Sequence, residues 1–400
     1  MRVFFITDKP FPHGGASTNR LICYAKAIRS QNVECKLLVY VRTESLEKTF
    51  GNMEGVGTYE GIPFEYINHS TLHANNIIKQ KFEGFIDRIS LLKYLKKNVC
   101  SGDVVFYYAL DELIWIPLVA AVVHGKKGKI VKEVCELPFI FGTYSKVSRF
   151  YRKLMTKYHF PKFDGIISIS EELLKFSKHY AGRKTKHIKV PILVDYNKYS
   201  LPDRSNEADN FYIFHAGSLT EQKDGILGMI EAFGKASERL NHQLFFISTG
   251  RADNSPHKLR IKELIEENNI SNEVRFVGYL NEEELQDYLS KASLVIINKY
   301  ETEQNQYCFS TKLAEYFAAS KPVIITRVGE AMNWVTDKLN VWLVEPGDVN
   351  QLSSAIVLLY NNVCLRKEMG KEGNILCQNC FRYEVYGKVL VDFFISFYNN

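Results

Sequence analysis

Short apolar runs alternate along this chain with longer segments whose apolar residues recur at helical spacing. Runs rich in Val, Ile and Phe are typical of buried strands. In residues 1–200, strands are predicted at Val3–Thr7, Glu34–Tyr40, Val104–Tyr107, Lys129–Val134 and Gly165–Ile169. In residues 201–400, they are predicted at Tyr212–Ala216, Gln243–Thr249, Val274–Val277, Leu294–Ile297 and Val323–Thr326. Strands that alternate with helices indicate parallel sheets with crossover helices.

The length of the chain indicates two domains, because 400 residues exceed what one hydrophobic core organises. The stretch Asp195–Asn210 is polar and nearly free of aliphatic residues, which favours a linker. We therefore expect an α/β fold with two doubly wound, Rossmann-like domains that face each other across a cleft. Ligands of such domains bind at the carboxyl ends of the strands.

Composition excludes several classes of protein. With 46% hydrophobic and 24% charged residues, the chain is ordinary globular material. No apolar run is long enough to span a membrane, and the apolar core of residues 1–12 is too short for a signal peptide. The eight cysteines are scattered, mostly among apolar neighbours, which indicates reduced, buried thiols, and the lone pair Cys377 and Cys380 is read as structural. We expect a cytoplasmic protein, with the inner face of the cytoplasmic membrane as a further location.

The net charge of +6 is unevenly distributed. Residues 1–200 hold 31 Lys and Arg against 18 Asp and Glu, whereas residues 201–400 hold 20 against 27. The basic excess concentrates in residues 79–97 and 146–162, where cations and aromatic or aliphatic residues recur at helical spacing, as in helices that lie on anionic membranes. For residues 79–97, the alternative to a membrane-bound helix is a helix with a solvated polar face. For the second we expect a membrane or acceptor surface at Arg149, Arg152, Lys153 and Lys157. No nucleic-acid-binding module accompanies this charge.

The segment Ser293–Thr326 reads as strand, loop, helix and strand. Ser310 or Thr311 is a natural N-cap there, and Lys312 adds a positive charge to the first turn. Glu315 follows three positions later on the same helix face. A helix N-terminus binds a diphosphate, and a carboxylate one turn along accepts hydrogen bonds from ribose hydroxyls. The alternative is an exposed ion pair beside an ordinary cap.

Two further loops follow predicted strands and contain glycine. Gly14 and Gly15 follow the first strand of the chain, and paired glycines there let a ligand approach the backbone. Residues 217–225 follow the first strand of the second half and place Lys223 just before a helix. Neither loop carries the GxGxxG pattern, which argues against an NAD-type oxidoreductase. No HExxH or DxD spacing occurs, and no metal site is predicted.

Taken in order, these segments match one family of enzymes. They are Gly14-Gly15, residues 163–174 (FDGIISISEELL), 189–195 (KVPILVD), 217–225, 275–296, 310–326 and 344–348 (VEPGD). The chain resembles a family 4 (group 1) glycosyltransferase of the GT-B fold. The resemblance covers essentially the whole chain, and its strength lies in the ordered set rather than in any one motif.

The resemblance implies a retaining, metal-independent enzyme that moves a sugar from a nucleotide-diphosphate sugar to an acceptor hydroxyl. It implies no cofactor. The nucleotide sugar is expected on a C-terminal domain, residues 196–380, and the acceptor on residues 1–195, to which a final helix near residues 381–400 returns. Family members often build capsule, exopolysaccharide or lipopolysaccharide, so the expected acceptor is a saccharide or a lipid-linked saccharide.

The resemblance also assigns residues. It places Lys223 at the family's phosphate-binding lysine and Glu315 at its ribose-binding glutamate. The expected donor-binding set is Gly14, Gly15, Gly217, Ser218, Lys223, Asn305, Ser310, Thr311, Lys312 and Glu315.

Two positions depart from the family pattern. Ser218 stands where the family often has arginine, and Tyr307 stands where it often has the first of two glutamates. Lys312 is expected to supply some of the missing positive charge, with Asn305 or Glu303 on the sugar.

Glu133 and Glu136 follow a predicted strand of the first half. One of them is expected to orient the acceptor hydroxyl, and Glu136 joins Lys223 and Glu315 as a candidate catalytic residue. The alternative is a pair of solvated glutamates that balance nearby lysines.

Two other functions compete with glycosyl transfer. A nucleotide-sugar epimerase would need more acids and histidines in the cleft than the sequence offers. A degenerate glycosyltransferase kept as a scaffold stays open, because the arginine and the first glutamate are missing.

Overall fold

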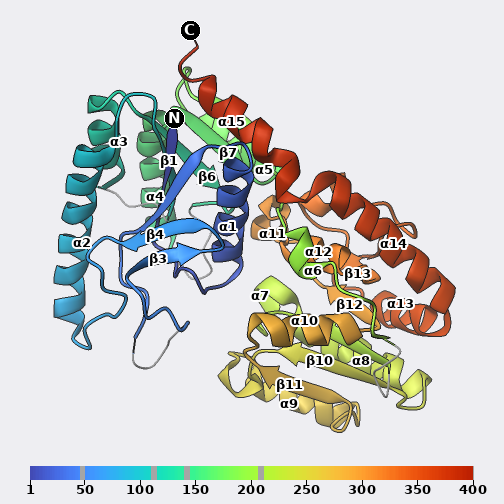
Figure 1. The fold of residues 1–400 in the computed structure, drawn as a ribbon. Coiled ribbons are helices and arrows are strands. Elements are labelled where there is room, and N and C mark those ends of the chain that lie inside the picture. Colours follow the sequence, from blue (N-terminus) through green and yellow to red (C-terminus); the bar gives the residue numbers. More distant parts are fainter. Residues whose placement is uncertain (46–49, 110–114, 139–144, 206–210, 400) are drawn as a thin grey trace. The chain divides into compact units, whose positions relative to one another are not determined.

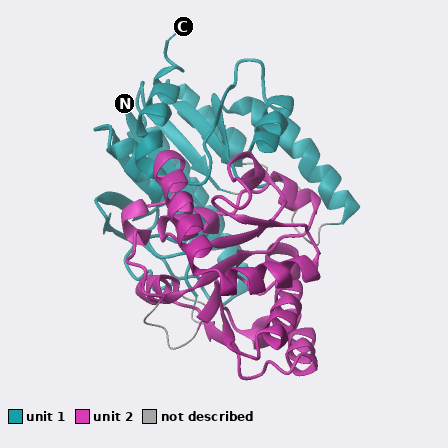
Figure 2. Ribbon diagram, turned by 90° about the vertical axis from the view of Figure 1, so that its right-hand side faces the viewer, with its two compact units in different colours: residues 1–193, 383–400 teal, residues 194–382 magenta. Residues whose placement is uncertain are grey.

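The computed structural model describes residues 1–45, 50–109, 115–138, 145–205 and 211–399. The chain forms two compact units (Figure 2). Unit 1 is Met1–Leu193 with Tyr383–Asn400, and unit 2 is Val194–Arg382. The chain leaves unit 1 within two residues of the expected boundary after residue 195, and it returns within two residues of the expected boundary after residue 380.

Unit 1 is built on an eight-stranded sheet with the order β3-β4-β2-β1-β5-β6-β7-β8 (Figure 1). Neighbouring strands are parallel except for the antiparallel pair β3 and β4. The strands are β1 Arg2–Thr7, β2 Glu34–Val39, β3 Val56–Tyr59, β4 Ile62–Tyr66, β5 Val104–Tyr108, β6 Lys129–Val134, β7 Gly165–Ser168 and β8 Lys186–Lys189. Every residue of β5 and β7 is buried, as expected for parallel strands covered on both faces.

Helices connect these strands and supply the rest of the core of unit 1. They are α1 Ala16–Arg29, α2 Ile77–Asn98, α3 Trp115–Gly125, α4 Lys146–His159, η1 Phe160–Lys162, α5 Glu171–Tyr180, η5 Tyr383–Tyr386 and α15 Gly387–Ile395. The C-terminal α15 packs against α1, and its Phe394 joins the core beside Phe106 of β5. Gly165 permits this packing, because a Cβ there would lie 2.4 Å from the Phe397 ring.

Unit 2 is built on a six-stranded, wholly parallel sheet with the order β11-β10-β9-β12-β13-β14 (Figure 1). The strands are β9 Phe211–His215, β10 Leu244–Thr249, β11 Val274–Gly278, β12 Leu294–Ile297, β13 Val323–Thr326 and β14 Trp342–Val344. The helices are α6 Tyr196–Tyr199, α7 Glu221–Asp224, α8 Ile226–Arg239, η3 Ala252–Asn254, α9 Lys258–Glu267, α10 Glu282–Lys291, α11 Glu303–Tyr307, α12 Lys312–Ala318, η4 Glu330–Asn333, α13 Val349–Asn361 and α14 Val363–Cys380. Because β9 and β12 are central neighbours, loops that follow them share one edge of the sheet.

All ten predicted strands are present, and the described residues form four further strands that were not predicted. The hairpin of β3 and β4 contains Gly and Pro and is only partly buried, so it lacks a continuous apolar run. The short β8 is polar, and β14 has three residues. These strands pair at or near sheet edges, where neighbouring strands rather than local sequence decide the conformation.

The linker prediction for residues 195–210 is wrong in its described part. Residues 195–205 belong to unit 2 and pack on it. Tyr199 is buried, Arg204 donates its N–H to Ser290 O at 3.0 Å, and Asp203 pairs with the buried Lys321 at 2.7 Å. The segment is polar because it makes hydrogen bonds and ion pairs. Residues 206–210 lie outside the described part of the chain.

The eight cysteines are all free thiols, as predicted, but burial is not general among them: Cys100 and Cys364 are exposed. No helix within the described ranges is both long enough and apolar enough to cross a membrane.

Candidate functional site

The loop of residues 216–225 follows β9 at the carboxyl edge of the unit 2 sheet. Neighbouring side chains hold its first residues in place. Ala216 donates its N–H to the Tyr316 hydroxyl at 3.1 Å. Thr249, at the end of β10, accepts from Gly217 N at 2.8 Å and donates to Gly217 O at 3.1 Å. The loop therefore presents its backbone in a fixed position.

Gly217 is required by two side chains that approach it closely. A Cβ at this position would lie 2.2 Å from His215 Cε1 and 2.9 Å from Lys312 Nζ. The predicted glycine loop and the predicted helix lysine therefore do meet in the folded unit. This meeting is between residues almost one hundred positions apart, and it defines the centre of the candidate site.

Asp224 is the buried anion of this site, and sequence reasoning missed it. Its Oδ1 lies 2.5 Å from Lys312 Nζ. Its Oδ2 accepts from Ser218 N at 2.9 Å and from Ser218 Oγ at 2.7 Å. Although burial opposes ionisation, Lys312 and His215 hold the pKa of Asp224 well below its usual value. Lys312 therefore shares its charge with a fixed carboxylate rather than standing alone.

His215 is also buried in the site. Its Nδ1 lies 3.0 Å from Ser248 Oγ, and its Nε2 lies 3.7 Å from Asp224 Oδ1. Burial lowers the pKa of His215, and the charge of Lys312 lowers it further. The imidazole is therefore neutral near pH 7.

Lys223 lies on α7, and its side chain is exposed. No acidic residue in the described part of the chain forms an ion pair with it. Gly225, which follows α7, adopts a left-handed φ of +57°, and its carbonyl accepts from Asn298 Nδ2 at 2.8 Å. This turn directs the chain into α8 and leaves the ammonium group of Lys223 available to a ligand.

Lys299 enters the site directly after β12 and was not predicted. Its N–H donates to Thr326 Oγ1 at 2.8 Å, and its Nζ donates to Lys223 O at 3.1 Å. Burial lowers its pKa, and the charges of Lys312 and Lys223 contribute to that lowering.

Asn305 does not have the free side chain expected of a sugar contact. It is buried, and its Nδ2 donates to Tyr300 O at 2.9 Å and to Gln222 O at 3.3 Å. These hydrogen bonds support the loops, and the sugar contact of Asn305 stays a prediction. Glu303, the alternative, is exposed at the first position of α11.

The start of α12 differs from the predicted capped helix. Thr311 occupies the N-cap position with helical backbone angles, and its side chain makes no capping hydrogen bond. Ser310 contributes only its carbonyl, which accepts from Leu313 N at 3.1 Å. The N-cap position is therefore one of the two predicted, although the Thr311 hydroxyl does not cap the helix, and Lys312 begins the helix.

Glu315 lies one turn into α12. No described residue donates a hydrogen bond to its carboxylate. Burial raises the pKa of Glu315 from 4.5 to about 7, with Lys312 opposing the rise and Glu282 adding to it. A carboxylate without a donor, close to its midpoint at neutral pH, is suited to receive donors from a ligand.

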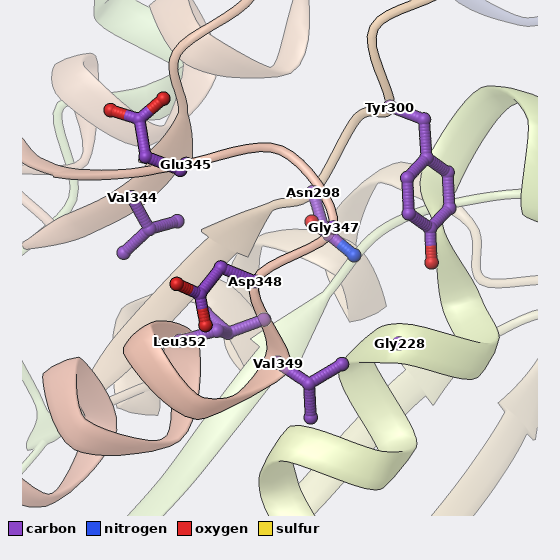
Figure 3. A pocket seen from close by; sticks show the side chains of 9 residues that line it. All are labelled: Gly228, Asn298, Tyr300, Val344, Glu345, Gly347, Asp348, Val349 and Leu352. Atoms are coloured by element: carbon purple, nitrogen blue, oxygen red, sulfur yellow. The ribbon is translucent and has the colours of Figure 1, made fainter.

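A small pocket opens beside Asn298 and Tyr300, between α8 and the loop from β14 to α13 (Figure 3). The Tyr300 ring points toward Gly228 in this view, and a Cβ at Gly228 would lie 2.7 Å from the Tyr300 hydroxyl. Asp348 of the VEPGD segment caps α13 by accepting from Gln351 N at 2.8 Å. This segment therefore shapes the edge of the sheet and has a structural role.

In unit 1, the two predicted glycines differ in their surroundings. A Cβ at Gly14 would lie 2.1 Å from Thr18 Oγ1, so packing alone requires a glycine there. Gly15 is the N-cap residue of α1, and a Cβ on it would meet no atom within 4 Å. Close approach of a ligand therefore remains a prediction for Gly15, whereas Gly14 has a packing explanation.

Of the two predicted glutamates, Glu133 lies within β6 and Glu136 follows the strand, and their surroundings differ. Glu133 is buried, pairs with Arg20 and accepts from the Tyr24 hydroxyl at 3.0 Å. The Arg20 guanidinium also donates to Pro191 O at 2.7 Å. Glu133 thus belongs to a core ion pair, so the interpretation of both glutamates as solvated is wrong for it. Glu136 is partly buried and has no described hydrogen-bond partner, and it stays the candidate.

The basic residues predicted on the second segment lie on α4. This helix carries no acidic residue, and Arg149, Lys153 and Lys157 are exposed, while Arg152 is partly buried. An apolar stripe is exposed on the same helix. Its members are Val147 at 78%, Phe150 at 71%, Leu154 at 50% and Tyr158 at 52% exposure. Cations and large apolar side chains therefore occur together on a helix surface that the protein itself leaves uncovered.

No group of three or more His, Cys, Asp or Glu side chains suited to a metal ion occurs in the described ranges.

The site residues that were not predicted from the sequence differ in how clearly the sequence indicates them. Lys299 is the second polar residue after an apolar run, at the strand end where ligands bind, so position alone was a usable signal. Asp224 follows Lys223 and His215 ends β9, but their burial depends on contacts with α12 and β10. No local pattern carries that information.

Comparison with known proteins supports this architecture. Residues 200–375 match the family model "Glycosyl transferases group 1". An uncharacterized glycosyltransferase of Methanocaldococcus jannaschii is 24% identical over 335 residues, covering 78% of this chain and 90% of the relative. The lipopolysaccharide core biosynthesis glycosyltransferase LpsD of Rhizobium meliloti is 26% identical over 193 residues, covering 48% of this chain and 51% of LpsD.

Solved structures share the fold over the full chain. Sucrose-phosphate synthase of Thermosynechococcus elongatus superposes with a TM-score of 0.75 at 16% identity and covers 100% of this chain and 99% of its own. HepE of Anabaena, in complex with UDP and glucose, gives 0.72 at 17% identity and covers 99% and 100%. The fold prediction is confirmed: this chain has the GT-B fold, and residues 200–375 match the group 1 glycosyl transferases.

Proposed function

We propose that the protein is a retaining glycosyltransferase that works without a metal ion and takes its sugar from a nucleoside diphosphate sugar bound to unit 2. One observation carries the proposal. The loop of residues 216–225, which carries Lys223, meets Lys312 of α12 at Gly217, at the carboxyl edge of the sheet. Glu315, which has no hydrogen-bond partner among the described residues, lies one turn along α12. The lysines suit a diphosphate, and Glu315 suits a ribose diol.

The chemistry follows from charge development at the leaving group. When the bond from the sugar to the diphosphate breaks, negative charge grows on the departing oxygen. Lys223, which has no carboxylate partner among the described residues, is placed to stabilise that charge, and Lys312 contributes beside it. Fixed cations serve in this position as a metal ion does in other glycosyltransferases. Neutral His215 and the rigid backbone at Gly217 keep the site preorganised.

The proposed acceptor is a hydroxyl of a saccharide or lipid-linked saccharide in cell-surface polysaccharide synthesis. Its support is the match to a lipopolysaccharide core glycosyltransferase and the amphipathic α4. Glu136, partly buried and without a described partner, is the proposed group that orients this hydroxyl.

The first test is a calorimetric and thermal-shift screen of the purified protein with UDP, GDP, TDP, CMP and their sugars, each with and without EDTA. UDP is the first choice because HepE was solved with it. We expect one nucleoside diphosphate to stabilise the protein equally in both conditions. Loss of binding in EDTA would overturn metal independence. Once an acceptor is known, the NMR signal of the anomeric proton of the product shows whether the anomeric configuration of the sugar is retained.

Changing Lys223 to alanine is expected to weaken binding of that diphosphate about tenfold, because one charge-assisted hydrogen bond is lost. The side chain is exposed, so the melting temperature should not change. Lys258→Ala, at an exposed lysine of α9, is the matched control. Equal affinities of the Lys223 variant and the control would remove Lys223 from the donor site.

We further propose that α4 lies on the inner, anionic face of the membrane, with its apolar stripe in the interface and its cations on lipid headgroups. A variant with Arg149, Lys153 and Lys157 changed to glutamate should lose binding to phosphatidylglycerol vesicles by about 100-fold or more, at roughly 1 kcal/mol for each basic residue. Vesicle co-sedimentation measures this loss.

The control for α4 changes the exposed Lys367 and Lys371 of α14 to glutamate. This pair has the same spacing as Arg149 and Lys153. Equal loss in the two variants would indicate a general charge effect. Binding of wild-type protein to phosphatidylcholine as strong as to phosphatidylglycerol would contradict an electrostatic contact.

A further inference from the structure

Lys299 occupies a position in unit 2 that neither the motifs nor the proposed function accounts for. It follows β12, the central neighbour of β9, at the carboxyl edge of the sheet. Its backbone is anchored, because its N–H donates to Thr326 Oγ1 at the end of β13 at 2.8 Å. The side chain therefore starts from a rigid point.

The side chain extends to the loop of residues 216–225. Its Nζ donates to Lys223 O at 3.1 Å and reaches Asn305 Oδ1 at 3.5 Å. Asn305 in turn donates to Gln222 O at 3.3 Å. Lys299 thus sits against the backbone of the residue whose side chain is proposed to bind the diphosphate.

The charge balance around Lys299 is uneven. Three ammonium groups act on this loop, those of Lys223, Lys299 and Lys312. Two carboxylates lie on the same loop. Asp224 is already 2.5 Å from Lys312 and accepts twice from Ser218, and Glu221 accepts from Leu227 N at 2.7 Å. Buried His215 is neutral. The cluster therefore has one more positive than negative charge.

Such an excess has a physical consequence. Burying a cation near other cations disfavours its charged form, and the pKa of Lys299 is lowered for this reason. A dianion placed on the loop would reverse the penalty and favour full protonation of the cluster. The diphosphate of a nucleotide sugar carries two negative charges at neutral pH and so more than balances this positive excess.

We propose that Lys299 is a third cation of the diphosphate site and binds the diphosphate of the nucleotide sugar together with Lys223 and Lys312. The proposal rests on the proposed function and deepens it. In this proposal Lys299 also supplies positive charge in place of the arginine that the family often has at the position of Ser218. Lys299 acts by binding, and the chemistry of transfer stays as described above.

The test measures UDP binding by titration calorimetry in wild-type protein and in Lys299→Gln and Lys299→Arg. Glutamine keeps a donor for the Lys223 carbonyl and removes the charge. We expect about 10-fold to 100-fold weaker UDP binding in Lys299→Gln and recovery to within a few-fold in Lys299→Arg. Circular dichroism and the melting temperature establish that each variant is folded.

A purely structural role is separated by the salt dependence of binding. Removing a ligand-binding charge flattens the dependence of UDP affinity on salt between 0.05 and 0.5 M, roughly the range over which screening of charges changes most. If Lys299 only holds the α7 carbonyls in place, Lys299→Gln should leave the salt dependence of UDP affinity as in wild type. Lys299→Gln with wild-type affinity and slope would overturn the inference. If wild-type protein binds no nucleoside diphosphate, the proposed function itself has failed.

Discussion

Glu315→Gln is expected to weaken UDP binding by about 100-fold while making the folded protein more stable at pH 8. The loss of affinity follows from the proposed contact, since a neutral amide accepts hydrogen bonds from a ribose diol less strongly than a carboxylate does. The gain in stability has a separate cause. Burial of the Glu315 carboxylate penalises its charged form, and glutamine has no charge to bury.

The sign of the pH dependence is fixed by the pKa of Glu315, which rises from 4.5 to about 7 on folding. Between these values the folded protein holds a proton that the unfolded chain has released. The free energy of unfolding therefore falls as pH rises from 4.5 to 7, by about 1–3 kcal/mol for a partly exposed group. Glu315→Gln removes this loss of stability. The variant should therefore have a higher free energy of unfolding than wild type at pH 8 and no such difference at pH 4.5.

The same pKa predicts how binding responds to pH. Donation by ribose hydroxyls favours the ionised carboxylate, so UDP should bind about tenfold more tightly at pH 8 than at pH 6 through this group. Glu315→Gln should show little of that dependence. Calorimetric titrations and urea unfolding at both pH values measure the two effects.

Glu368→Gln, at an exposed glutamate of α14, is the control for these measurements. It should match wild type in affinity and stability. Undiminished UDP affinity in Glu315→Gln would remove Glu315 from the donor site. A stability advantage of equal size at pH 4.5 and pH 8 would contradict the raised pKa.

Lys312→Met is expected to lower the free energy of unfolding by about 3 kcal/mol, because it leaves the buried Asp224 carboxylate without its ion-pair partner. The charge of Lys312 is one cause of the lowered pKa of His215, so protonation of His215 in the variant offsets part of this loss. UDP affinity should fall as well. The single variant cannot separate these effects, since a partly unfolded protein also binds less ligand. Urea unfolding and UDP titration are therefore measured on one preparation.

The double variant Lys312→Met, Asp224→Asn separates them. Asparagine keeps the acceptor for Ser218 and carries no charge, so much of the lost stability should return. UDP affinity should stay about tenfold or more below wild type, because a cation of the site is still missing. Recovery of both properties would show that Lys312 serves the fold alone. Failure to recover stability would show that the ion pair with Asp224 is not what Lys312 provides to the fold.

The sequence by itself determined the fold and the central parts of the candidate site. The strands with continuous apolar runs were predictable because parallel strands are buried on both faces and need such runs. The loop with Gly217 and Lys223 and the helix with Lys312 and Glu315 were predictable because each lies where a strand ends and a helix begins.

Only the tertiary structure determined which partners the charged side chains of these segments have. The partner of Lys312 is Asp224, 88 positions away, and Lys299 reaches the carbonyl of Lys223 across 76 positions. The strands β3, β4, β8 and β14, which lie at or near sheet edges, lack a local signal and form because neighbouring strands supply their hydrogen bonds. Burial and ion pairing are properties of contacts between distant segments, so a sequence pattern reveals which residues stand at strand ends but not which of them is neutralised, buried or left for a ligand.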